Sequence, residues 1–181
     1  MIAALALVVL AFAPRSPAQQ AGPTEFQVEA AYLYHFGDFV TWPSSAAAAN
    51  LKEFPICILG RDPFGSTLDD IVKGSAIEGA PIRARRVTAA KDATSCRIVF
   101  LSSSEARHVE SDLSDLRGSP VLTVSDIPDF DLRGGMIQFV LIDRRVRFEI
   151  NLSTAQKAGL KLSSQLLKVA VAVRSVRNPK E

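Results

Sequence analysis

The sequence contains 181 residues, of which 48% are hydrophobic and 22% are charged, and its formal net charge at pH 7 is +2. This composition is typical of a globular domain and excludes a disordered chain or one that lies mostly in a membrane. The near balance of charges argues against nucleic-acid binding, which usually relies on a strongly basic surface. The length fits one domain with its own hydrophobic core.

Residues 1–18 are predicted to form a secretory signal peptide. Twelve apolar residues follow Met1, a run too short to cross a bilayer as a helix but typical of the apolar region of a signal. Small residues precede a cleavage site after Ala18, but no basic residue directly follows Met1, and a buried N-terminal helix is the alternative interpretation. No later stretch is long enough for a membrane span, so we expect no direct membrane insertion. Residues 19–23 are predicted to form a flexible N-terminal tail.

A helix is predicted from residue 25 to about residue 40. Thr24 as the N-cap, with Gln27 three residues later, forms the pattern of a capping box. The apolar and aromatic residues of this helix, among them Tyr32 and Phe36, cover more than one stripe. A helix of this kind is buried on most sides, so we expect it to pack on a sheet and also on a second subunit.

Strands and helices then alternate with short connections. The predicted elements are a strand at 56–59, a helix at 63–72, strands at 82–87 and 97–101, a helix at 104–116 and a strand at 120–124. Asp62 is the expected N-cap of the first of these helices, with Pro63 at its first position. Alternation of this kind favours a parallel sheet that is covered by helices on both faces.

The C-terminal part of the domain has a different pattern. Strands at 136–142 and 145–151, separated by Asp143 and Arg144, predict an antiparallel hairpin. Helices are expected at 153–158 and 164–173. The fold class is therefore α/β: a single domain over residues 24–174, with a mostly parallel sheet flanked by helices on both faces and a C-terminal antiparallel hairpin. A polar C-terminal tail follows at 175–181.

The second strand of the hairpin alternates cleanly between apolar and polar residues. Val146, Phe148 and Ile150 are expected to face inward. The outward row consists of Arg145, Arg147, Glu149 and Asn151. This row is interpreted either as a hydrated surface or as a recognition surface for a small anion or a partner protein.

The chain has two cysteines, Cys57 and Cys96. An even number of cysteines in an exported protein favours one intramolecular disulfide. Both residues precede or begin strands that we expect to be parallel. Because parallel strands start at the same edge of a sheet, the two thiols can lie close together if their strands are neighbours. Two buried free thiols are the alternative.

No catalytic constellation stands out. Residues 60–67 have the spacing of a phosphate-binding loop, but Ser66 replaces the required lysine and Asp62 adds a negative charge where an anion would sit. A tight turn between strand and helix is the better interpretation. With only two histidines and paired cysteines, a metal site is not expected. We predict no catalytic residues, no cofactor and no metal, and therefore that the protein is not an enzyme.

Blocks of sequence that follow one another in order resemble the YfiR family of periplasmic proteins. They are EAAYLYHF at 29–36 with FVTWP at 39–43, ICILGRDPFG at 56–65, GSPVLTV at 118–124, GGMI at 134–137, VRFEIN at 146–151 and AGLKLSSQLL at 158–167. No single block is decisive, but the ordered set is specific and covers nearly all of the mature chain.

The resemblance implies a repressor in the periplasm that binds the periplasmic part of an inner-membrane diguanylate cyclase. Repression would lower cyclic di-GMP and biofilm formation, and an outer-membrane-associated partner would relieve it. The resemblance also implies a homodimer. Cys57 and Cys96 match one cysteine pair of the family, whereas a second pair that some members carry nearer the C-terminus is missing.

The expected contact residues for a partner or ligand lie on the hairpin and on the first helix. They are Arg147, Glu149 and Asn151 together with Tyr32 and Phe36. The alternative function is a periplasmic small-molecule-binding or sensor protein without a cyclase partner, which would use the arginine and glutamate side chains of the hairpin.

Overall fold

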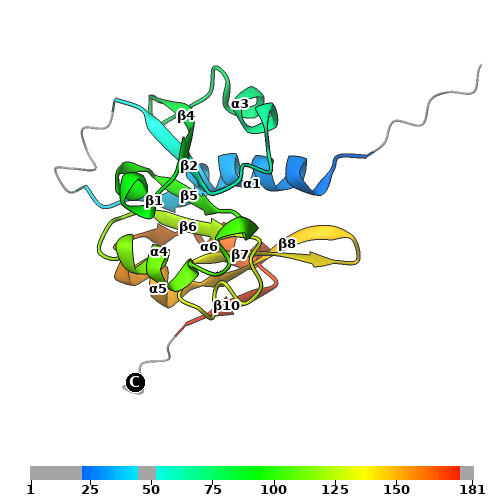
Figure 1. The fold of residues 1–181 in the computed structure, drawn as a ribbon, viewed down its shortest axis with the longest axis vertical. Helices are drawn as coiled ribbons and strands as arrows, with labels where there is room; N and C mark the ends of the chain where they lie inside the picture. Colours follow the sequence, from blue (N-terminus) through cyan, green and yellow to red (C-terminus); the bar gives the residue numbers. More distant parts are fainter. Residues whose placement is uncertain (1–21, 45–51, 176–181) are drawn as a thin grey trace, which may run out of the picture.

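The computed structural model describes residues 22–44 and 52–175. An eight-stranded sheet runs through the described residues, in the order β10-β8-β7-β6-β5-β2-β4-β3 (Figure 1). The predicted signal peptide and most of the two predicted tails lie outside the described residues.

The strands of this sheet are β2 (Phe54–Leu59), β3 (Ala76–Ile77), β4 (Ala80–Val87), β5 (Ile98–Leu101), β6 (Leu122–Ser125), β7 (Ile137–Ile142), β8 (Arg145–Asn151) and β10 (Ala172–Arg174). The five strands from β4 to β7 in spatial order are mutually parallel. β8 is antiparallel to β7, and β3 is antiparallel to β4. The mostly parallel sheet with a C-terminal hairpin is therefore confirmed.

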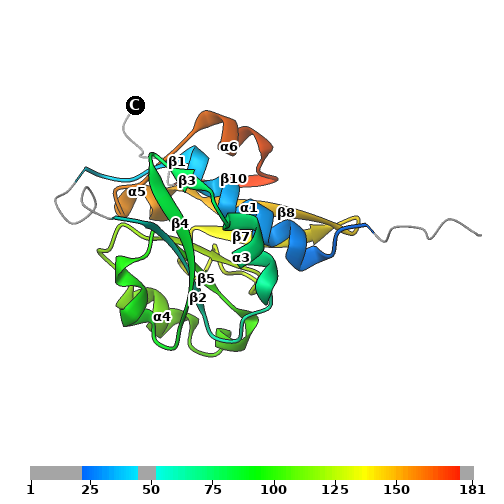
Figure 2. The same ribbon diagram turned by 90° about the horizontal axis from the view of Figure 1, so that it is seen from above.

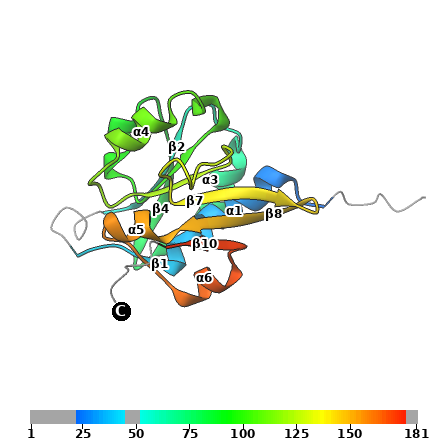
Figure 3. The same ribbon diagram turned by 90° about the horizontal axis from the view of Figure 1, so that it is seen from below.

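Helices cover both faces of the sheet, as Figures 2 and 3 show. One face packs against α1 (Glu25–Phe39), α3 (Ser66–Val72), α5 (Leu152–Lys157) and α6 (Ser164–Val169), and the other against α4 (Val109–Asp115) and the 3₁₀ helix η1 (Ala90–Ser95). In β2, Ile56 and Ile58 belong to the first core, whereas Cys57 and Leu59 belong to the second. Burial on both faces explains why this strand is apolar without alternation.

Helix α1 begins at the predicted capping box. The backbone N–H of Thr24 donates to Gln27 Oε1 at 2.8 Å, and the N–H of Gln27 donates to Thr24 Oγ1 at 3.3 Å. The buried side chains lie along one stripe, which includes Glu29, Leu33 and Phe36. The helix is thus covered along one face, with half-buried side chains beside it, rather than on most sides as its composition suggested.

Two predicted helices are shorter than expected because local turns compete with them. The helix expected at 63–72 begins at Ser66, since Asp62 Oδ1 accepts from the N–H groups of Phe64 and Gly65 and so caps a turn instead. The helix expected at 104–116 is divided into a 3₁₀ turn, η2 (Ser103–Glu105), and α4. Between them the N–H of His108 donates to the carbonyl of Glu105, a bond of 3₁₀ type.

The chain leaves the last predicted helix earlier than expected. Helix α6 ends at Val169, and β10 follows it and runs parallel to β8. The N–H of Val171 donates to the carbonyl of Phe148 at 3.0 Å, and β-branched residues such as Val171 and Val173 favour a strand. A further short pair, β1 (Val40–Thr41) with β9 (Lys161–Leu162), joins the end of α1 to the C-terminal part.

Candidate functional site

The β7–β8 hairpin projects beyond the rest of the sheet (Figures 1 and 3). Asp143 and Arg144 form its turn and both have positive φ, 49° and 58°, as a two-residue turn that matches the twist of the strands requires. Val146, Phe148 and Ile150 are buried, as the alternation predicts. The hairpin is thus anchored by one apolar face and presents polar side chains on the other.

The outward row of β8 divides into two halves. Arg145 and Arg147 are exposed, and among the described residues neither has a carboxylate within ion-pair distance. Glu149, in contrast, is half-buried, and its Oε2 lies 2.9 Å from Nη2 of Arg174 on β10. Asn151 accepts the N–H of Thr154 at 3.0 Å and is the N-cap of α5.

Asp131 organises the base of the hairpin, the end at which β7 begins and β8 ends, although no sequence pattern indicated its role. Its side chain is 1% exposed and forms an ion pair with Nε of Arg174. Its carbonyl accepts from Nδ2 of Asn151 at 2.8 Å. Together with Glu149 these groups connect the loop before β7, the end of β8 and β10. Two of the predicted contact residues therefore already have partners within the chain.

The predicted contact residues on α1 belong to an aromatic cluster. The ring centroids of Tyr32 and Phe148 are 5.4 Å apart, and those of Phe36 and Phe148 are 5.3 Å apart. Phe139 on β7 lies 5.9 Å from both α1 rings. Phe36 is 1% exposed, whereas Tyr32 is half-buried at the edge of the cluster. The cluster fixes α1 against the hairpin, and only Tyr32 can be reached from outside.

A buried carboxylate lies on the same stripe of α1. Glu29 is 1% exposed, and its Oε2 has no hydrogen-bond partner among the described residues. Burial above all, and then the charges of Asp126 and Glu25, raise its pKa to about 8. The pKa of Asp126 is also raised, mainly by burial. The spacing of Glu29 from Leu33 and Phe36, which matches one helix face, could have revealed this burial.

A cavity of about 530 Å³ lies between the first turn of α1 and the tip of the hairpin. It is lined by apolar atoms of Val28, Leu141 and Val146. Its charged lining consists of Glu25, Arg144, Arg145 and Arg147. A second cavity of about 520 Å³, beside α4 and α5, includes Arg117, Thr123, Thr154 and Lys157 in its lining.

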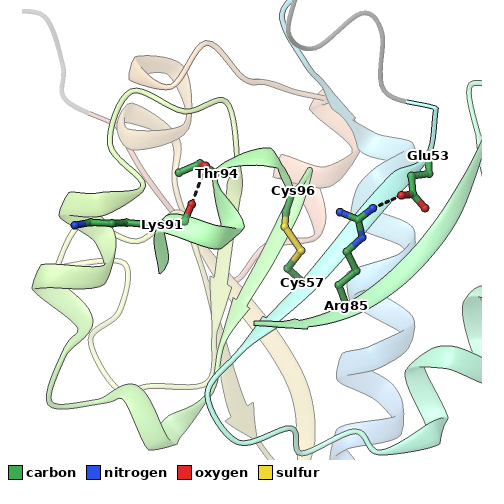
Figure 4. The surroundings of a disulfide bond; sticks show 6 residues. All are labelled: Glu53, Cys57, Arg85, Lys91, Thr94 and Cys96. Carbon is green, nitrogen blue, oxygen red and sulfur yellow. Dashed lines mark hydrogen bonds and ion pairs between the residues drawn. A yellow bond between two sulfur atoms is a disulfide. The ribbon is translucent and has the colours of Figure 1, made fainter. Parts of the chain in front are cut away.

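The expected disulfide is present. Cys57 on β2 is bonded to Cys96, which precedes β5, and their Cα atoms are 6.1 Å apart (Figure 4). The two strands are parallel neighbours, as the prediction required. Both cysteines are buried in the core beneath η1 and α4, and nearby Arg85 forms an ion pair with Glu53. The crosslink therefore joins β2, at the centre of the sheet, to the segment that leads into the neighbouring strand β5.

In residues 60–67, which have the spacing of a phosphate-binding loop, the carboxylate of Asp62 occupies the position that a bound anion would take. The carboxylate of Asp62 accepts the N–H groups of Phe64 and Gly65 and lies 2.8 Å from the guanidinium of Arg86. At the carboxyl ends of β2 and β5, where open α/β sheets often bind ligands, the hydroxyl of Ser104 accepts the N–H of Arg61 at 2.9 Å. Within the part of the chain that the structure describes, no group of three or more metal-binding side chains gathers.

Comparisons with known proteins agree with this architecture. The sequence model of the YfiR/HmsC-like family matches residues 26–171. Across the described residues, no helix is long and apolar enough to cross a membrane.

Among solved structures, a conserved domain protein from Vibrio cholerae O1 biovar El Tor has a TM-score of 0.54 at 10% identity, over 83% of this chain and 60% of that one. The chain thus spans 60% of the length of the Vibrio protein, and the likeness concerns the fold alone. An ABC domain in complex with L-Trp from Streptococcus pneumonia has a TM-score of 0.49 at 14% identity, over 67% of this chain and 55% of that one.

Proposed function

Because this chain belongs to the YfiR/HmsC-like family of periplasmic regulators, we propose that it binds the periplasmic part of an inner-membrane diguanylate cyclase and holds that enzyme inactive. Its action lowers cyclic di-GMP and so limits biofilm formation. The observation that carries this proposal is the family match, which extends from α1 to the residue before β10. The family is regulatory rather than catalytic, and the protein acts by binding.

The periplasm is the compartment in which this function operates. The predicted signal peptide at residues 1–18 supports export, and family membership supports the same location. A disulfide between Cys57 and Cys96 also fits an oxidising compartment.

Two further partners belong to the proposal. An outer-membrane-associated regulator relieves repression by sequestering this protein, and the protein itself is a homodimer. Exposed valines near the free edge of the sheet support an interface there: Val169, Val171 and Val173.

The contact surface for the cyclase includes Arg147 on the hairpin and Tyr32 on α1. Glu149 and Asn151 contribute by holding the base of the hairpin in place, since both already bond within the chain. Phe36 contributes by packing beneath Tyr32, with ring centroids 5.9 Å apart.

The proposal is tested by deleting the gene and measuring cyclic di-GMP. We expect the level to rise and to return when the wild-type gene is supplied. A tagged copy should retain a membrane cyclase when periplasmic complexes are purified. An unchanged cyclic di-GMP level, with no cyclase retained, contradicts the proposal.

A second candidate function is a periplasmic small-molecule-binding protein or sensor. The cavity beside α4 and α5 supports it, because hydroxyl and cationic groups from Arg117, Thr123 and Lys157 contribute to one hollow of about 520 Å³. A thermal-shift screen of periplasmic metabolites separates the two candidates. A specific ligand that raises the melting temperature at micromolar concentration favours the sensor.

A further inference from the structure

We propose that the uncovered edge of β8 at the hairpin tip is the docking site for an extended, acidic segment of the partner protein. The inference rests on the proposed function for the identity of that partner. Its evidence, however, is the geometry and charge of the hairpin itself.

The outer edge of β8 is only half covered. β10 pairs with β8 over Glu149–Asn151, and the last bond toward the tip joins Val171 N to the carbonyl of Phe148. From Arg145 to Arg147 no described strand lies beside that edge, and the hairpin extends past β10 (Figure 3). An uncovered strand edge offers backbone donors and acceptors that an extended peptide can use.

The cavity of about 530 Å³ adjoins this edge and offers space for side chains of the docked segment. Val28 on α1 and Val146 on β8 form part of its apolar lining, and Leu141 completes the lining at the hairpin. Leu141 and Ile142 are 55% and 43% exposed. A segment that continues the sheet beside β8 can therefore place an apolar side chain in the cavity and others against the tip.

The charge of the tip selects the chemistry of the segment. Arg144, Arg145 and Arg147 line the cavity, and among the described residues none lies within ion-pair distance of a carboxylate. Glu25 is the one carboxylate among the described residues of the lining, so the positive charge remains in excess there. Guanidinium groups bind carboxylates through paired hydrogen bonds, and unpaired charges on an edge discourage neutral strands. The fitting partner is thus an extended segment rich in glutamate or aspartate and interrupted by apolar residues.

The test uses two charge-reversal variants of the full mature chain with equal changes in net charge. R144E/R145E/R147E alters the tip. The matched control R61E/K91E/R107E alters three exposed basic residues that line neither cavity and form no ion pair among the described residues. Thermal unfolding verifies that each variant folds, and R144Q/R145Q/R147Q replaces the tip variant if charge reversal prevents folding.

The direct measurement is fluorescence anisotropy with a labelled peptide that alternates glutamate and leucine. We expect the wild type and the control to bind it, the tip variant to bind at least tenfold more weakly, and binding to weaken as salt increases. The same peptide with glutamine in place of glutamate should bind none of the proteins well. Equal binding by both variants, or binding only to vesicles of anionic lipid, overturns the inference.

The cellular measurement separates this inference from the proposed function. In the deletion strain, the wild type and the control should restore low cyclic di-GMP, whereas the tip variant should not. If all three restore it, the docking site is wrong and the function stands. If the wild type fails to restore it, the function is wrong, and the peptide measurement still decides whether the tip binds acidic segments.

Discussion

At the base of the β7–β8 hairpin the polar side chains form ion pairs and hydrogen bonds with one another, whereas at its tip no arginine side chain forms an ion pair among the described residues. Glu149 and Asn151 occupy the same outward row as Arg145 and Arg147, yet only the first two meet partners. Glu149 meets Arg174 on β10, whereas Asn151 meets the carbonyl of Asp131 and the N–H of Thr154. Groups satisfied within the chain stabilise the fold, and groups left unsatisfied are available to a partner.

Among the variants considered, removal of the disulfide should cause the largest loss of unfolding free energy, and the effects at the hairpin can be compared with it. Replacing both Cys57 and Cys96 with alanine should lower the free energy of unfolding by about 4 kcal/mol, because the crosslink restricts the unfolded chain. Urea denaturation of the oxidised wild type and the double variant measures this loss. A loss below about 1 kcal/mol would show that the bond does not stabilise the sheet.

The ion pair at the base comes next. Replacing Asp131 with alanine removes a buried carboxylate that bonds the exposed Arg174, and it should cost roughly 2 kcal/mol of unfolding free energy because hydrogen bonds of charged groups contribute about that much. The control is D70A, since Asp70 is exposed and forms no ion pair in the part of the chain described here. Equal urea midpoints for the two variants would show that Asp131 does not stabilise the base of the hairpin.

Glu29, like the arginines at the tip, carries a side-chain group without a partner among the described residues, but this group is buried. Its pKa of about 8 in the folded protein exceeds the usual 4.5, so the folded state binds more protons than the unfolded state between these values. Stability should therefore fall as pH rises from about 5 to 8, by on the order of 2 kcal/mol.

The variant E29Q should remove most of this pH dependence and be more stable than the wild type at pH 8. Asp126, whose pKa burial also raises, keeps its own contribution in this variant. The exposed E25Q variant is the control, and unfolding free energies measured at pH 5 and pH 8 check the prediction. An unchanged slope in E29Q would place the titrating group elsewhere.

The tip should show the smallest effect on stability. The variant R144Q/R145Q/R147Q removes charges that make no ion pair among the described residues, so the unfolding free energy should change by less than about 0.5 kcal/mol. Thermal denaturation measures it. A larger loss would mean that the tip, like the base, has a structural role.

The sequence predicted the long elements better than the short ones. β2 and β5 were recognised as uninterrupted apolar runs, and the hairpin by its alternation, because burial on two faces or one face imposes these patterns. β3, β9 and β10 were missed, since strands of two or three residues depend on the neighbour they pair with. The ends of α3 and α6 were misplaced for a similar reason, as turns and pairing outweighed helix propensity.

The candidate site was predicted in part. The alternation placed Arg147 and Glu149 on one face, but nothing local could indicate that Arg174, 25 residues after Glu149, would reach only one of them. The disulfide was predicted from residue count and strand order. Asp131 was missed because its loop has no regular period, and its role depends entirely on distant groups.

The bond between Cys57 and Cys96 also sets an order of events in the life of the chain. Thiols stay reduced in the cytosol, so there the same sequence lacks a crosslink that spans 39 residues across the centre of the sheet. A chain exported through the predicted signal peptide meets oxidising conditions only after it has crossed the membrane. The native state thus gains the stability that the disulfide contributes only after export.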